Sequence, residues 1–210
     1  MIRIKTLEKT KRLLWIGVWT LTAIGIVMVI RRIGIIAGLG KYLISPRFPF
    51  DSALNKHPAL TIVHIIPGLI FMILGPFLFM RRHSIQPSVI YTFISVSYII
   101  GISALTIPFI VLPIGGLNEA VASSFFALLF LIATSLALRS MLNKKPDLFR
   151  EWIMRSYAIG LAIATVRPIM ALCFAFFAVR PEVFLGTAFW LGFSLHAIAA
   201  ELWINYTRKA

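Results

Sequence analysis

The stretch ALTIVHIIPGLIFMILGPFLFM, residues 59–80, decides the fold of this chain. It contains no lysine, arginine, aspartate or glutamate, and its one histidine is His64. As a helix rising about 1.5 Å per residue, it is about 33 Å long, enough to cross a hydrocarbon core about 30 Å thick. Because lipid offers no hydrogen-bond partners, the backbone has to bond to itself, as it does in a helix. The stretch therefore predicts a membrane-spanning α-helix.

Further long apolar runs lie on both sides of this stretch. A membrane β-barrel would instead show short segments of alternating hydrophobicity. The sequence therefore predicts an all-α integral membrane bundle of about six helices, with a basic tail at residues 1–12 and a short tail at 207–210. Besides the helix at 59–80, the predicted helices cover residues 13–30, 89–112, 119–138, 152–179 and 183–206.

The composition agrees with a membrane protein. Hydrophobic residues make up 60% of the chain, charged residues only 13%, and the mean hydropathy is +0.92. A soluble domain carries about a quarter charged residues. The net charge of +14 would suggest nucleic acid as a partner in a soluble protein, but the lysines and arginines here lie mainly between the apolar runs. This placement favours the lipid bilayer as the partner and argues against nucleic acid.

The distribution of lysine and arginine predicts the orientation. With six helices and the N-terminus in the cytoplasm, the cytoplasmic tails and loops carry more basic residues than the outer loops do. Because basic residues are retained on the cytoplasmic side, we expect both termini there, in a protein of the cytoplasmic membrane. The first outer loop is the exception, and its Arg31 and Arg32 could snorkel from the end of the first helix.

Four ionisable side chains inside the last two predicted helices are the informative ones. They are Arg155 and Arg167 in the fifth helix and His196 and Glu201 in the sixth. A charge at the centre of a bilayer costs a few kcal/mol, so such groups usually face the bundle interior and have partners. The two helices are joined by a tight turn near Arg180 and therefore run antiparallel. This puts Glu201 between the depths of the two arginines and predicts an Arg–Glu pair across the helices.

Two interpretations of this predicted polar centre remain open. The ion pair could be purely structural, since buried pairs often only hold helices together. Alternatively, Arg167, His196 and Glu201 could line a site for an anion, a quinone or another polar substrate. We include Tyr157 in the centre, although Arg155 could instead lie at the head-group level beside it.

His64 lies near the outer end of the second predicted helix. A hydrogen-bonded, buried imidazole is the simpler interpretation. The alternative is a haem with His64 and His196 as axial ligands, which needs both histidines at one depth. His196 is expected several ångströms deeper, which counts against a haem. We therefore predict no metal site and no cofactor, with haem or quinone as alternatives.

Several motifs give the chain a family resemblance. It resembles a bacterial family of predicted membrane proteins catalogued as domain of unknown function 2306. Because that family has no assigned activity, the resemblance implies a multi-pass topology and the choice of polar residues, but no function. The matching stretches are His57-Pro58 with His64 and Pro67-Gly68, Leu74-Gly75-Pro76, Arg150 to Ala158, Arg167, and Ala200 to Ile204.

The chain departs from the family pattern in two places. Phe149 stands where a histidine commonly precedes the Arg-x-Trp stretch. Gln86-Pro87-Ser88 occupies the region where a His-Arg pair usually opens the third helix. If those histidines carry metal, haem or proton chemistry in relatives, this chain has lost it.

Three functions are compatible with these patterns. The first is an accessory or assembly factor with a structural Arg/Glu/His centre. The second is a haem- or quinone-linked redox protein, and the third is a transporter of small solutes or ions. The sequence predicts no catalytic residue, and it leaves open whether the protein is an enzyme, whether it has a protein partner and whether it forms a homo-oligomer.

Overall fold

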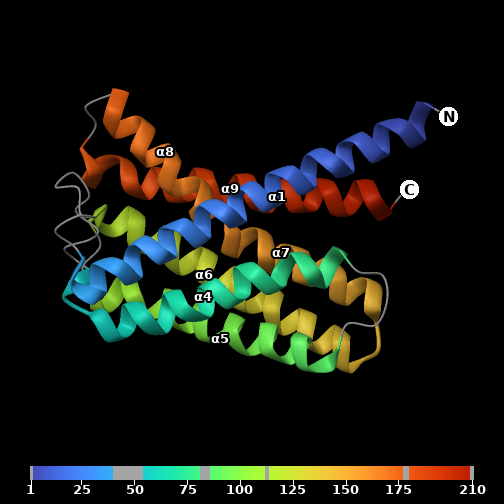
Figure 1. Cartoon of the computed structure of the whole chain (residues 1–210), viewed down its shortest axis with the longest axis horizontal. Coiled ribbons are helices and arrows are strands. Elements are labelled where there is room, and N and C mark those ends of the chain that lie inside the picture. Colours follow the sequence, from blue (N-terminus) through green and yellow to red (C-terminus); the bar gives the residue numbers. More distant parts are fainter. Residues whose placement is uncertain (1, 40–53, 81–85, 112–113, 177–179, 209–210) are drawn as a thin grey trace.

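The computed structural model describes residues 2–39, 54–80, 86–111, 114–176 and 180–208. Within these ranges every regular element is a helix, which confirms the predicted all-α class (Figure 1). The elements are α1 (Ile2–Gly34), the short π-helix η1 (Ile35–Leu39), α4 (Pro58–Met80), α5 (Pro87–Ile110), α6 (Gly116–Leu142), α7 (Pro146–Leu161), α8 (Ile163–Phe176) and α9 (Pro181–Arg208).

The described helices are long and apolar enough for a multi-pass membrane protein. Five of them, α1, α4, α5, α6 and α9, could each cross a bilayer. Helices α7 and α8 have 16 and 14 residues, so each is short for a crossing on its own, and they follow one another directly along the chain. The start of α1 and the end of α9 lie at the same end of the bundle, as an even number of crossings requires (Figure 1).

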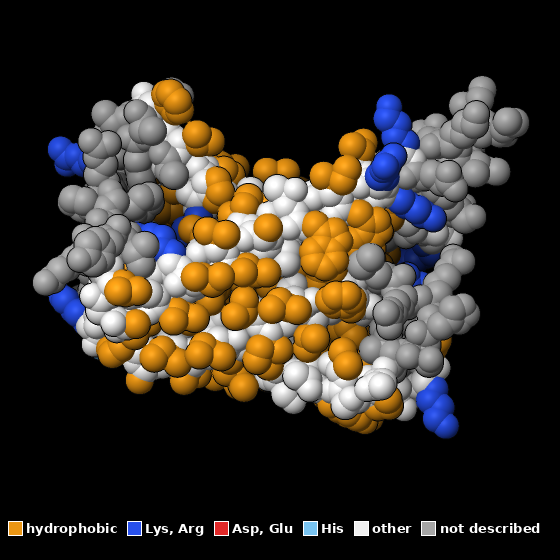
Figure 2. All heavy atoms as spheres, in the orientation of Figure 1, with side chains coloured by type: hydrophobic (Ala, Val, Ile, Leu, Met, Phe, Trp, Pro, Cys, Tyr) orange, Lys and Arg blue, Asp and Glu red, His pale blue; other side chains and the backbone are white. Residues whose placement is uncertain are grey.

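The surface has the polarity of a membrane-embedded bundle. Hydrophobic side chains cover the middle of the face seen in Figure 2, and lysines and arginines gather toward its two ends. Among the outward-facing residues are Phe109, Leu128, Leu195 and Leu202. Apolar side chains are compatible with lipid tails, and basic side chains prefer the head groups. The pattern therefore indicates that the apolar middle of the bundle lies in the hydrocarbon core and that its two ends lie near the head groups.

An aromatic cluster holds the centre of the bundle together. The ring of Phe71, on α4, lies 4.8 Å from that of Phe93, 5.5 Å from Phe130 and 5.4 Å from Tyr157, measured between centroids. All four side chains are buried. Helices α4, α5, α6 and α7 therefore share one core.

Two helices begin several residues earlier in the structure than the sequence predicts. Helix α1 begins at Ile2, so the segment predicted as a basic tail continues the first helix; its lysines and arginines are good helix formers. The helix predicted at 152–179 begins earlier, at Pro146, because proline is well suited to a first helical turn. Residues 177–179 lie outside the described ranges.

The same predicted helix is also interrupted, at Ala162. The N–H of Ala162 bonds to the carbonyl of Ile159, three residues back, at 3.2 Å, and the regular pattern resumes with Val166 bonding to Ala162 at 3.0 Å. Pro168, further along α8, has no N–H and therefore cannot donate a backbone hydrogen bond to the helix. The break changes the direction of the chain between α7 and α8 (Figure 1).

Candidate functional site

A cavity of about 320 Å³ lies in the half of the bundle away from the chain ends. Its walls come from the end of α1, the first half of α4, the end of α5, the first half of α6, the end of α7, the start of α8 and the first half of α9. Most of the lining is apolar. The ionisable residues among it are Arg31, Arg32, His64, Glu119 and Arg167.

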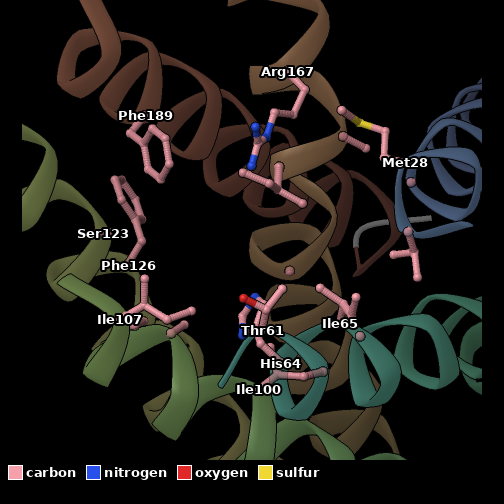
Figure 3. Close-up of a pocket in the computed structure, with 18 of the residues that line it drawn as sticks. Met28, Thr61, His64, Ile65, Ile100, Ile107, Ser123, Phe126, Arg167 and Phe189 are labelled. Atoms are coloured by element: carbon pink, nitrogen blue, oxygen red, sulfur yellow. The ribbon is translucent and has the colours of Figure 1, made fainter. Parts of the chain in front are cut away.

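His64 enters the cavity from α4 (Figure 3). Its Nδ1 lies 2.8 Å from the hydroxyl oxygen of Ser103 on α5. The backbone carbonyl of Ile100 is a second hydrogen-bond partner of the imidazole. These contacts confirm that the imidazole is hydrogen-bonded, and they fix the orientation of the ring.

Arg167 enters from α8 and faces His64 from the opposite wall (Figure 3). Its guanidinium is close enough to the Glu119 carboxylate for the two charges to attract each other. Oε2 of Glu119 also accepts a hydrogen bond of 2.6 Å from the N–H of Gly115, the residue that precedes α6. Glu119 therefore caps α6 and places a negative charge near Arg167.

Sequence reasoning did not assign three of these residues to a site. Arg31 and Arg32 were expected only to snorkel from the end of a helix, and Glu119 was counted as the start of one. Charges that flank an apolar run are ambiguous in sequence, because the same pattern serves topology. Only the tertiary structure, in which α1 packs against α8 and α6 packs against α7 and α9, shows that they share a cavity with Arg167.

The predicted Arg–Glu pair between the last two helices is confirmed, and Arg155 makes it. Arg155 donates to both carboxylate oxygens of Glu201, from Nε at 2.5 Å and from Nη2 at 3.0 Å. Glu151, one turn before Arg155, lies 3.7 Å from it and also accepts hydrogen bonds from Arg208. We call these four residues the ion-pair network; it joins α7 to the end of α9.

His196 lies beside the break between α7 and α8. Its Nε2 is 2.8 Å from the hydroxyl of Thr165, just after the break, and the imidazole also bonds to the carbonyl of Ala158, just before it. That carbonyl would normally accept the N–H of Ala162, which turns to Ile159 instead. His196 therefore satisfies a backbone group that the break releases.

Tyr157 is fully buried among three helices. Its hydroxyl lies 2.9 Å from that of Thr22 on α1 and donates to the carbonyl of Met72 on α4 at 3.1 Å. Its ring rests against Gly75, where a Cβ would come within 2.0 Å of it. Tyr157 therefore works as a packing and hydrogen-bonding residue of the core.

The predicted polar centre is thus divided among separate places. Arg155 and Glu201 belong to the ion-pair network, His196 to the helix break and Tyr157 to the core, whereas Arg167 lies in the cavity with His64. His196 is not among the residues that line the cavity. The structure therefore does not bring His64 and His196 into one cavity, as a haem with both as axial ligands would need. In the described part of the chain no three potential metal ligands cluster together.

The fold defines a multi-pass helical membrane protein with an internal cavity. The sequence profile of the family described as "Predicted membrane protein (DUF2306)" matches residues 61–204, more than half of the chain. The chain belongs to this family, as the motifs around Arg150 to Ala158 indicated. No curated protein and no solved structure matches it.

Proposed function

We propose that this protein binds a lipid-soluble quinone in the cavity between His64 and Arg167, as an accessory or redox-linked component of the membrane. The observation that carries the proposal is the position of these two polar side chains on opposite walls of a mostly apolar cavity (Figure 3). A quinone ring carries its two oxygen atoms on opposite edges. It therefore needs one polar group on each side.

The size and lining of the cavity suit such a molecule. Small-molecule sites usually measure about 300–1,000 Å³ and combine apolar walls with a few polar groups that fix the orientation. Phe126 and Phe189 border the cavity on one side (Figure 3). Aromatic rings stack favourably in offset or edge-to-face geometry, so these side chains suit a flat ring.

The charges of the lining favour an electron-rich head group. Arg31, Arg32 and Arg167 line the cavity together with one carboxylate, that of Glu119. A guanidinium donates several hydrogen bonds and accepts none. An oxygen atom placed near Arg167 would therefore receive a charge-assisted hydrogen bond, which is stronger than a neutral one.

The test is quinone binding to the detergent-purified protein. The probe is ubiquinone with a single isoprenyl unit, and the signal is quenching of tryptophan fluorescence, since Trp190 lies 5.4 Å from the cavity residue Phe126. We expect saturable quenching, and we expect Arg167→Gln to weaken binding about tenfold, because a hydrogen bond to a charged group contributes about 1.5–3 kcal/mol.

The matched control is Arg139→Gln, an exposed arginine on α6 that does not line the cavity. It should leave the affinity unchanged. Non-saturable quenching by the wild type, or equal affinity in the wild type and Arg167→Gln, would refute the proposal. Thermal unfolding of each variant shows whether it is folded, and Arg167→Lys, which keeps the positive charge, should retain part of the affinity.

A further inference from the structure

The hydroxyl of Ser103 determines which nitrogen of His64 carries a hydrogen atom. Its oxygen lies 2.7 Å from the carbonyl of Ile99 and 2.9 Å from that of Ile100, and it donates to them. A hydroxyl has one hydrogen atom, and carbonyl oxygens only accept. With this hydrogen bound to the backbone, Ser103 offers His64 a lone pair. Nδ1 of His64 must therefore be the donor in the 2.8 Å contact.

The mostly apolar surroundings of His64 favour the neutral imidazole, which carries a hydrogen atom on one nitrogen and a lone pair on the other. Since Nδ1 is occupied by Ser103, the ring meets a ligand through Nε2, and that nitrogen is an acceptor.

A ligand between His64 and Arg167 therefore faces two different requirements. It has to donate a hydrogen bond to Nε2 of His64 and accept one from the guanidinium of Arg167. A quinone oxygen only accepts, so its lone pairs would face the lone pair of Nε2. A quinol carries a hydroxyl on each of two opposite edges of the ring, so one hydroxyl can donate to Nε2 of His64 while the oxygen of the other accepts from Arg167.

We propose that the cavity selects the reduced, hydroxyl-bearing quinol over the quinone, with Nε2 of His64 as the acceptor that discriminates between them. This inference rests on the proposed function and adds the redox form of the ligand. Ser103 is a positioning residue in this arrangement, since it acts on the ligand only through the imidazole and does not line the cavity.

The experiment compares the affinities for the two redox forms. Anaerobic calorimetric titrations use ubiquinone with a single isoprenyl unit and its borohydride-reduced quinol. We expect the wild type to bind the quinol at least tenfold more tightly than the quinone. Ser103→Ala removes the oxygen atom that accepts from Nδ1 and so weakens the preference for this tautomer; the ratio should fall, while the affinity for the quinone stays within about threefold. His64→Gln should abolish the preference as well, because an amide can turn either its oxygen or its nitrogen to the ligand.

The matched control is Ser97→Ala. Ser97 is a buried serine on the same helix, and its hydroxyl donates to the carbonyl of Phe93 at 2.7 Å, away from His64. This variant should keep the wild-type ratio. Equal binding of both forms by the wild type, or an unchanged ratio in both Ser103→Ala and His64→Gln, would overturn the inference and leave the proposed function standing. Failure of both forms to bind would overturn the proposed function itself.

Discussion

The two ends of the bundle use arginine in different ways. In the ion-pair network, Arg155 meets two carboxylates, Glu201 and Glu151, and links α7 to α9. Among the described residues that line the cavity, three arginines stand beside one glutamate, and a volume of about 320 Å³ remains. Arginines matched by carboxylates hold helices together, whereas arginines beside an open volume can also contact a ligand. The same residue type on adjacent helices thus has two roles.

The largest expected effect lies between these two regions, at Gly75. A Cβ at this position would come within 2.0 Å of the Tyr157 ring, and Tyr157 is held by Thr22 and Met72. Gly75→Leu should therefore destabilise the protein by about 3 kcal/mol or more, through overpacking. Thermal unfolding in detergent measures the effect.

The control for this prediction is Gly68→Ala on the same helix, where a Cβ meets nothing within 4 Å. It should be neutral or slightly stabilising, because alanine favours a helix by about 0.5–1 kcal/mol. Equal unfolding temperatures for Gly75→Leu and the wild type would show that Tyr157 does not depend on the small residue.

The next prediction separates the two arginines directly. Arg155→Gln should lower stability by about 1.5 kcal/mol, because Glu201 loses its bidentate partner whereas Glu151 keeps Arg208, and should leave the affinity for the quinone within about twofold. Arg167→Gln should do the reverse, with a loss of affinity of about tenfold and a smaller change in stability. Unfolding and fluorescence titration of both variants test this. If both variants lose stability and affinity alike, the distinction between the two regions is wrong.

The smallest effect is expected at the break between α7 and α8. Thr165→Val removes the hydroxyl that lies 2.8 Å from Nε2 of His196, so one polar atom loses its partner. We expect a loss of about 1 kcal/mol. His196→Asn in the same background measures the coupling, since the cost of the double variant should be less than the sum of the single ones. Additive costs would mean that the two side chains do not act as a unit.

Sequence patterns predicted one arginine correctly and misplaced the other. The tight turn before α9 and a rise of about 1.5 Å per residue were enough to bring Glu201 near Arg155. The same estimate placed Arg167 about as near to Glu201 as Arg155. In the structure Arg167 lies on α8, beyond the break at Ala162, and lines the cavity instead of joining the ion-pair network. An estimate of depth along the helix axis does not give the face on which a side chain lies.

The sequence by itself determined the class of protein, the approximate positions of its helices and the family to which it belongs. Apolar runs of sufficient length permit only helices in lipid, so this information is local and additive. The tertiary structure alone decided that His64, Arg167, Glu119 and the two arginines at the end of α1 share one cavity. Which face a membrane helix turns inward depends on its neighbours, and apolar residues all around a helix leave no periodic signal of that face.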